Sequence, residues 1–140
     1  MNLYNFNSHG VCINPNSPVS IHTRNCSLVV YTAQLSNGMW NYGFDLDYFN
    51  AFCSRPVVIY ECPSYCFYTE SLCIIDCLDK VESKIVHRLE EISNFYTDDS
   101  LDFDSHTSIK HSTIVTSLNV FLEKLRKYKS KFDYLQLSLF

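Results

Sequence analysis

Four of the seven cysteines occur in two pairs with the same spacing, Cys62-x3-Cys66 and Cys73-x3-Cys77. Four thiolates are a ligand set that tetrahedral zinc accepts. The usual zinc-binding pair has two intervening residues, and no glycine follows either pair here to bend the loop. Because cysteine is among the residue types most often buried, we interpret these residues as reduced core side chains and expect no bound metal.

Other candidates for chemistry lack a local motif. A cysteine nucleophile would need a histidine close in space, and no known signature surrounds any cysteine. Asp102-x-Asp104-x-His106 could hold a divalent cation, but it lacks the glycine and the distal glutamate of an EF-hand loop. We therefore expect no catalytic residue and no cofactor, and we interpret 97–111 as a solvated acidic loop.

Aromatic and arginine side chains suggest a binding site instead. Trp40 and Tyr42 have faces on which a base could stack, and Arg24 and Arg55 lie in flanking segments, where they could bind phosphate. These four residues are the predicted site for a nucleotide-type ligand. The alternative is that the rings belong to a core or interface cluster.

A dense basic run lies near the C-terminus, formed by Lys124, Arg126, Lys127, Lys129 and Lys131. Such a run could contact phosphate, or it could be the solvated face of a helix near its C-terminal end. The formal net charge of −4 favours the solvated face and argues against general nucleic-acid binding.

The elements that must position these residues are predicted from periodicity. The β-rich runs 28–35 and 39–49 are separated by Ser36-Asn37-Gly38, and Asn-Gly in this context predicts a tight turn with positive φ. Alternation over 19–24 and the run 56–61 predict further strands. We expect an antiparallel sheet of four to five strands.

Two helices should follow the strands. Thr69 is the predicted N-cap of the first, which extends to about residue 96 and presents one apolar stripe to the sheet. The second begins near 112, with apolar residues at alternating spacings of four and three: Ile114, Leu118, Phe121, Leu125, Tyr128, Phe132, Leu135 and Leu139. Residues 134–140 fit either a helix or a terminal strand.

These apolar residues form a seam along the second helix. The seam is larger than is needed to cover a sheet on which the first helix already packs. We therefore predict a homo-oligomer, most simply a dimer. Its predicted interface consists of Leu118, Phe121, Leu125, Tyr128 and Phe132.

Length and composition fit one α+β domain. The chain has 140 residues, of which 46% are hydrophobic and 15% aromatic, so it can bury a sizeable core. We divide it into a mainly β part (1–68), a helix (69–96), the acidic loop (97–111), and a helix with a possible terminal strand (112–140). No apolar run approaches the ~18 residues of a membrane span, and residues 1–10 lack signal-peptide features, which predicts a cytoplasmic protein.

The residue order Gln34-Leu35, Trp40-x-Tyr42-Gly43, Pro56, Phe67-x-Thr69 and an amphipathic helix resembles small phage and mobile-element proteins with three strands and a helix. It is also similar to the phage anti-Thoeris sponges, which sequester cyclic-ADP-ribose signals between protomers. The resemblance covers about residues 28–92, and no ligand-binding residue is carried over from it.

This resemblance implies a phage-encoded counter-defence protein in the host cytosol. We expect a non-catalytic protein that sequesters a small nucleotide-type signal. The alternative is a protein-binding inhibitor, anti-CRISPR-like or directed at another host complex, that uses the acidic segment Asp98–Asp104 as its contact.

Overall fold

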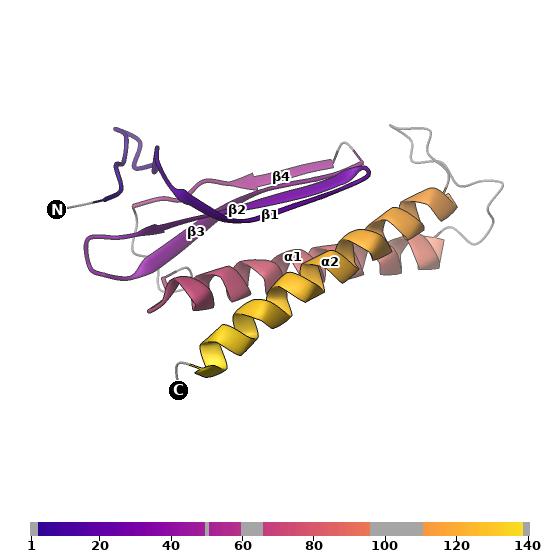
Figure 1. Ribbon diagram of the computed structural model, residues 1–140. Coiled ribbons are helices and arrows are strands. Elements are labelled where there is room, and N and C mark those ends of the chain that lie inside the picture. Colours follow the sequence, from indigo (N-terminus) through magenta and orange to yellow (C-terminus); the bar gives the residue numbers. More distant parts are fainter. Residues whose placement is uncertain (1–2, 50, 60–65, 96–110, 139–140) are drawn as a thin grey trace.

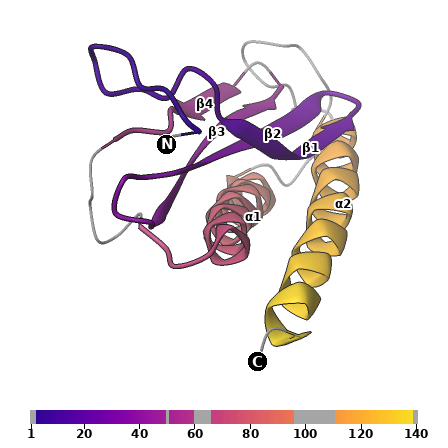
Figure 2. The ribbon, with the colours of Figure 1, turned by 60° about the vertical axis from the view of Figure 1, so that its left-hand side comes forward.

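The computed structural model describes residues 3–49, 51–59, 66–95 and 111–138. Its strands are β1 (Asn16–Thr23), β2 (Cys26–Gln34), β3 (Trp40–Tyr48) and β4 (Ala51–Arg55), which pair antiparallel in chain order. The helices α1 (Glu70–Phe95) and α2 (His111–Ser138) lie on the same face of the sheet (Figures 1 and 2). The predicted α+β fold, with a four-stranded antiparallel sheet, one long helix and a C-terminal helix, is confirmed.

Alternation along the strands separates the two faces of the sheet. Leu28 of β2 pairs with Ile21 of β1 and Leu46 of β3, and all three side chains are buried against the helices. On the opposite face, a smaller cluster of Cys12, Ala33 and Val57, with Tyr4, Phe6 and Tyr31, covers the end near the β2–β3 turn. The other end of that face carries the exposed side chains of Ser20, His22 and Asp47.

The β2–β3 hairpin forms where Asn37-Gly38 predicts it, but the backbone conformation of the turn differs from the predicted one. Gly38 has a φ of 85°, and its N–H donates to the carbonyl of Leu35 at 2.9 Å. Leu35 N–H donates to Met39 at 2.7 Å, which closes a three-residue loop of the bulge type. Asn37 is not among the described residues with positive φ. Its side-chain oxygen instead accepts from Met39 N–H at 2.9 Å, so the prediction of positive φ holds for Gly38 alone.

The prediction of a strand over 56–61 is wrong for residues 56–59, which are the part of this run that the structure describes. β4 comes earlier and ends at Arg55, which pairs with Phe44. Residues 56 and 57 then pass over Gly43, where a Cβ would overlap the carbonyl oxygen of Arg55. Proline also cannot donate a ladder hydrogen bond at position 56, so the chain crosses β3 instead of extending the sheet. Residues 60 and 61 lie outside the described residues.

Helix α1 begins as its sequence predicts. The Thr69 hydroxyl accepts from Leu72 N–H at 3.1 Å, which satisfies one first-turn donor. The stripe that packs on the sheet is buried, and it consists of Cys73, Ile74, Cys77, Leu78, Val81, Ile85 and Ile92.

Helix α2 also packs into the core, beside α1 and below β1 (Figure 2). Leu118, Phe121 and Leu125 have 0% relative exposure, and Tyr128 and Phe132 are half-buried against the same core. Leu118, Phe121 and Leu125 of the predicted oligomer interface are therefore core residues of the single chain, whereas Tyr128 and Phe132 stay partly exposed. Residues 134–138 are helical rather than a strand, and 139–140 lie outside the described residues.

Part of the basic run holds the two helices together. Lys129 Nζ lies 2.7 Å from Asp79 and 3.7 Å from Glu82 of α1, and Arg126 lies 3.5 Å from Glu82. Lys124, Lys127 and Lys131 remain exposed. The solvated-face interpretation thus holds for three of the five basic residues. Within the described ranges, neither helix contains a stretch long and apolar enough to cross a membrane.

Candidate functional site

The four predicted ligand-binding residues do not form one site. Trp40 begins β3 beside the β2–β3 turn, whereas Arg24 lies in the β1–β2 turn at the other end of β2. Tyr42 and Arg55 lie together, with the guanidinium carbon 4.9 Å from the ring centroid. Arg24 is therefore separated from the other three by the length of a nine-residue strand.

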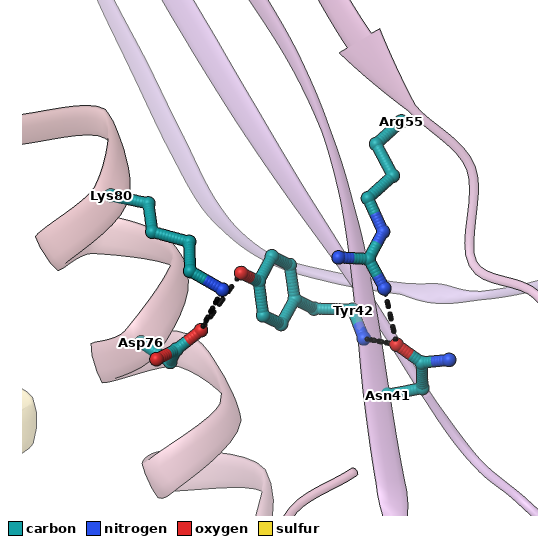
Figure 3. A network of polar contacts seen from close by, with 5 residues as sticks. All are labelled: Asn41, Tyr42, Arg55, Asp76 and Lys80. Atoms are coloured by element: carbon teal, nitrogen blue, oxygen red, sulfur yellow. Dashed lines mark hydrogen bonds and ion pairs between the residues drawn. The ribbon is translucent and has the colours of Figure 1, made fainter. Parts of the chain in front are cut away.

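Tyr42 is an internal residue. Its ring is fully buried between β3 and α1, and its hydroxyl donates to Asp76 at 2.8 Å (Figure 3). Lys80 binds the same carboxylate at 2.9 Å, and its ammonium lies 5.7 Å from the ring centroid. Burial, together with the hydrogen bond to Asp76, raises the pKa of Tyr42, so the hydroxyl stays protonated as a donor. A base could not stack on this ring.

Arg55 also takes part in the fold. Its Nη2 donates to Asn41 Oδ1 at 3.1 Å, and the same oxygen accepts from Tyr42 N–H at 2.7 Å (Figure 3). Asn41 Nδ2 donates to the carbonyl of Val58 at 3.0 Å. Because Asn41 is fully buried, this network ties β3 to the segment that crosses it, and we assign Arg55 a structural role here.

Trp40 packs at the same end of the sheet. Its ring is half-buried and meets Tyr4 edge-on, with centroids 6.1 Å apart. Its backbone exchanges hydrogen bonds with Phe67 at 2.7 and 2.9 Å. The alternative for these rings, membership of a core cluster, describes Tyr42 fully and Trp40 in part.

Arg24 lines a hollow between the β1–β2 turn and the first turns of α2. The hollow has a volume of about 390 Å³, and its walls are Thr23, Arg24, Ser112, Thr113, Thr116, Ser117 and Val120. Arg24 is exposed and makes no hydrogen bond or ion pair with any residue that the structure describes. A guanidinium and several hydroxyls are donors suited to phosphate oxygens, and no described wall residue is acidic.

A second hollow lies on the other side of the same turn. Its volume is about 290 Å³, and it is lined by His22, Thr23, Asn25, Cys26, Ser27, Asp47 and Phe49. Sequence reasoning missed this group, because the residues come from three segments. The alternation over 19–24 places Ser20 and His22 on one face, but the strand register is needed to bring Ser27 and Asp47 beside them.

Ser20 and His22 form a hydrogen bond of 2.9 Å between Oγ and Nε2. A serine nucleophile of the usual kind also needs a carboxylate on the other imidazole nitrogen. Asp47 lies two strands from His22, about 10 Å by ordinary strand spacing, with Ser27 between them. The described contacts therefore place no third group on this pair.

The cysteines of the zinc alternative are placed only in part. Cys73 and Cys77 are fully buried in α1, and burial raises the pKa of both thiols, that of Cys77 to about 12. Cys62 lies outside the described residues, as do Asp102, Asp104 and the rest of the predicted acidic loop up to residue 110. Among the described residues, no three side chains of His, Cys, Asp or Glu converge on a common point.

Comparisons with known proteins add no relative. No protein-family model, no curated protein and no solved structure matches the chain. Function must therefore be argued from the two hollows and their residues.

Proposed function

We propose that the protein is a non-catalytic binding protein that captures a small phosphate-bearing ligand of nucleotide type beside Arg24. The observation that carries this proposal is a hollow of about 390 Å³ lined by Arg24, which has no described protein partner, and by serine and threonine residues of α2. Ligand sites have volumes of roughly 300–1,000 Å³, so the volume of this hollow lies within the range of small-ligand sites.

The composition of the walls supports an anionic ligand. Ser112, Thr113, Thr116 and Ser117 can each donate one hydrogen bond, and Arg24 can donate two in parallel to one phosphate. Val120, which is 45% exposed, adds an apolar surface. The setting in phage counter-defence rests on the residue order from 34 to 69 alone, and the host cytosol follows from that setting.

Calorimetry against cyclic nucleotides, cyclic ADP-ribose isomers, nucleoside monophosphates and pyrophosphate tests the proposal. Arg24→Ala should weaken binding about 10- to 100-fold, because a charge-assisted pair is lost. Lys84→Ala is the matched control, since it removes the same charge from an exposed position on α1. The ligand should be recovered unaltered after heat denaturation.

Two results would contradict the proposal: no binding across the panel, or equal affinities for the Arg24→Ala variant and the unchanged protein. Absence of nucleotide binding together with capture of a host protein would favour the inhibitor alternative. The segment predicted for that contact, 98–104, lies outside the described residues.

A further inference from the structure

We propose that the nucleotide-type ligand is a short single-stranded oligonucleotide, whose phosphates lie along a basic face of α2 that begins at the Arg24 hollow. The lysines of this face are Lys124, Lys127 and Lys131, which together form a lysine stripe. The inference deepens the proposed function and rests on it, because it takes the phosphate beside Arg24 as one end of the bound chain. It names the ligand class as a linear chain of several phosphates, in preference to a mononucleotide.

Helical spacing places the lysine stripe on the same face of α2 as the wall of the hollow. Thr116 and Val120 line the hollow. Lys124, Lys127 and Lys131 follow Val120 at steps of four, three and four residues, and all three are exposed. Because residues three or four apart are neighbours on a helix surface, the stripe continues the hollow along the outer surface of α2.

The lysine stripe differs in its electrostatic surroundings from other basic residues of the two helices. Lys80 and Arg88 pair with carboxylates of their own helix, α1. Arg126 and Lys129 of α2 pair with carboxylates of α1. The lysines of the stripe form no ion pair with any residue that the structure describes. Basic residues that hold the fold together are thus separate from those that face outward.

Unpaired lysines at these spacings repel one another. Like charges three or four residues apart destabilise a helix, and the part of α2 between Ser112 and Phe132 contains a single acidic residue, Glu123. Glu123 lies at the margin of the basic face, where it lines a different hollow together with Arg126. A row of bound phosphates would remove the repulsion between the lysines. Such a local positive charge attracts a polyanion even though the net charge of the chain is −4.

The composition of this face favours phosphate groups of one strand. Arginine, lysine, serine and threonine side chains make many of the contacts that proteins form with nucleic-acid phosphates. The face combines Arg24 and the hydroxyls of Thr116 and Ser117 with the lysine stripe. The stripe is a single row, because Arg126 and Lys129 are turned to α1. A single row follows one strand, whereas a duplex presents two.

The length of the stripe sets the size of the ligand. At the rise of an α-helix, Val120 and Lys131 are about 16 Å apart along the axis of α2. A stacked strand has one phosphate about every 3.4 Å, so a chain of about five nucleotides spans this length. Lysine binds phosphate as a point charge and does not read the bases. We therefore expect the affinity to depend on chain length more than on base sequence.

Calorimetry with thymidylate chains of one, two and about six nucleotides tests the inference. The longest chain should bind at least about tenfold more tightly than the mononucleotide, because more phosphates are neutralised. Lys124→Ala and Lys127→Ala should each weaken binding of the longest chain about 3- to 10-fold and reduce the slope of log affinity against log salt by about 0.7. Neither variant should change binding of the mononucleotide. Lys84→Ala is the matched control, since it removes the same charge from an exposed position on α1.

The outcomes separate the two proposals. Equal affinities for the longest chain and the mononucleotide, or lysine variants that act no more strongly than Lys84→Ala, overturn the oligonucleotide inference and leave the Arg24 site standing. Tighter binding of a duplex of the same length, or of polyglutamate, also overturns it, because the stripe then serves another partner. Mononucleotide binding that Arg24→Ala does not weaken overturns the proposed function, and the inference with it. If no probe binds, both fall. Circular dichroism shows whether each variant is folded, which we expect for substitutions of exposed lysines.

Discussion

The absence of a side chain at Gly43 allows residues 56 and 57 to pass over β3. A Cβ at this position would overlap the backbone of Arg55, Pro56 and Val57, none of which can rotate away like a side chain. We expect Gly43→Ala to lower the free energy of unfolding by about 2–4 kcal/mol, as large steric changes in a core do. Urea denaturation measures the change.

Gly38 is the control for this substitution. A Cβ there meets no atom within 4 Å, and only its φ of 85° disfavours a side chain. Gly38→Ala should therefore cost about 1–2 kcal/mol, from the left-handed backbone alone. Equal losses for the two variants would show that residues 56 and 57 can move away from β3 at little cost.

Because of its buried thiols, the free energy of unfolding should depend on pH in the alkaline range. Burial raises the pKa of Cys26 from 9.0 to about 11 and that of Cys77 from 9.0 to about 12. Above about pH 9 the unfolded chain binds fewer protons than the folded one, so stability falls as pH rises through the folded-state values. We expect the free energy of unfolding to decrease between about pH 9 and 11, by at most about 1.4 kcal/mol per pH unit for each thiol.

Urea denaturation under reducing conditions, repeated from pH 8 to 10.5, checks this dependence. Cys77→Ala removes one of the thiols and should make the slope shallower, even though the smaller side chain lowers stability at every pH. An unchanged slope in that variant would mean that the Cys77 thiol does not ionise differently in the folded and unfolded chains.

At the scale of elements, Glu70 anchors the start of α1 to the sheet. Its Oε2 accepts from the Thr32 hydroxyl of β2 at 2.7 Å and from Asn16 of β1 at 3.0 Å. Thr32 is fully buried. The Glu70→Ala substitution would therefore leave the Thr32 hydroxyl without the carboxylate that accepts its hydrogen bond. We expect a loss of about 1–3 kcal/mol in the free energy of unfolding.

A double-mutant cycle with Thr32→Val isolates this contact. The double variant should lose less than the sum of the single variants, because valine removes the hydroxyl that Glu70 satisfies. Glu90→Ala, at an exposed position on the same helix, should change stability by less than about 0.5 kcal/mol. Additive losses in the cycle would argue against the hydrogen bond.

For the whole molecule, Ile114, Leu118, Phe121 and Leu125 of the α2 seam complete the core of one chain. Leu125 has 0% exposure, so an aspartate there would be an unpaired buried charge. We expect Leu125→Asp to lose the folded circular-dichroism signal at every protein concentration. Val120→Asp is the control on the same helix, because Val120 is 45% exposed and should tolerate the change.

Light scattering of the same variants tests the prediction that the α2 seam is an oligomer interface. A Leu125→Asp protein that stays folded with half the mass of the unchanged protein would restore the seam as an oligomer interface. Unfolding without a separable folded protomer would agree with its place in the core. Homo-oligomerisation itself remains a prediction that needs a surface other than Leu118, Phe121 and Leu125.

Sequence alone determined the features that depend on neighbouring residues. The Thr69 cap, the apolar stripe of α1 and the hairpin at Gly38 were all predictable, because capping and side-chain period are local properties of the backbone. The α+β class followed from these elements. The run 56–61 illustrates the limit of sequence reasoning: its composition favours a strand, but residues 56 and 57 instead pass over Gly43 of β3.

Only the tertiary structure decided what each face meets. Periodicity shows which residues share a face, but it does not say whether that face meets the sheet, another helix or water. Periodicity therefore could not show that Leu118, Phe121 and Leu125 of α2 are buried within one chain, or that Tyr42 points inward. The row of His22, Ser27 and Asp47 exists only through the pairing of three strands, because strand register brings together residues that are distant in the chain.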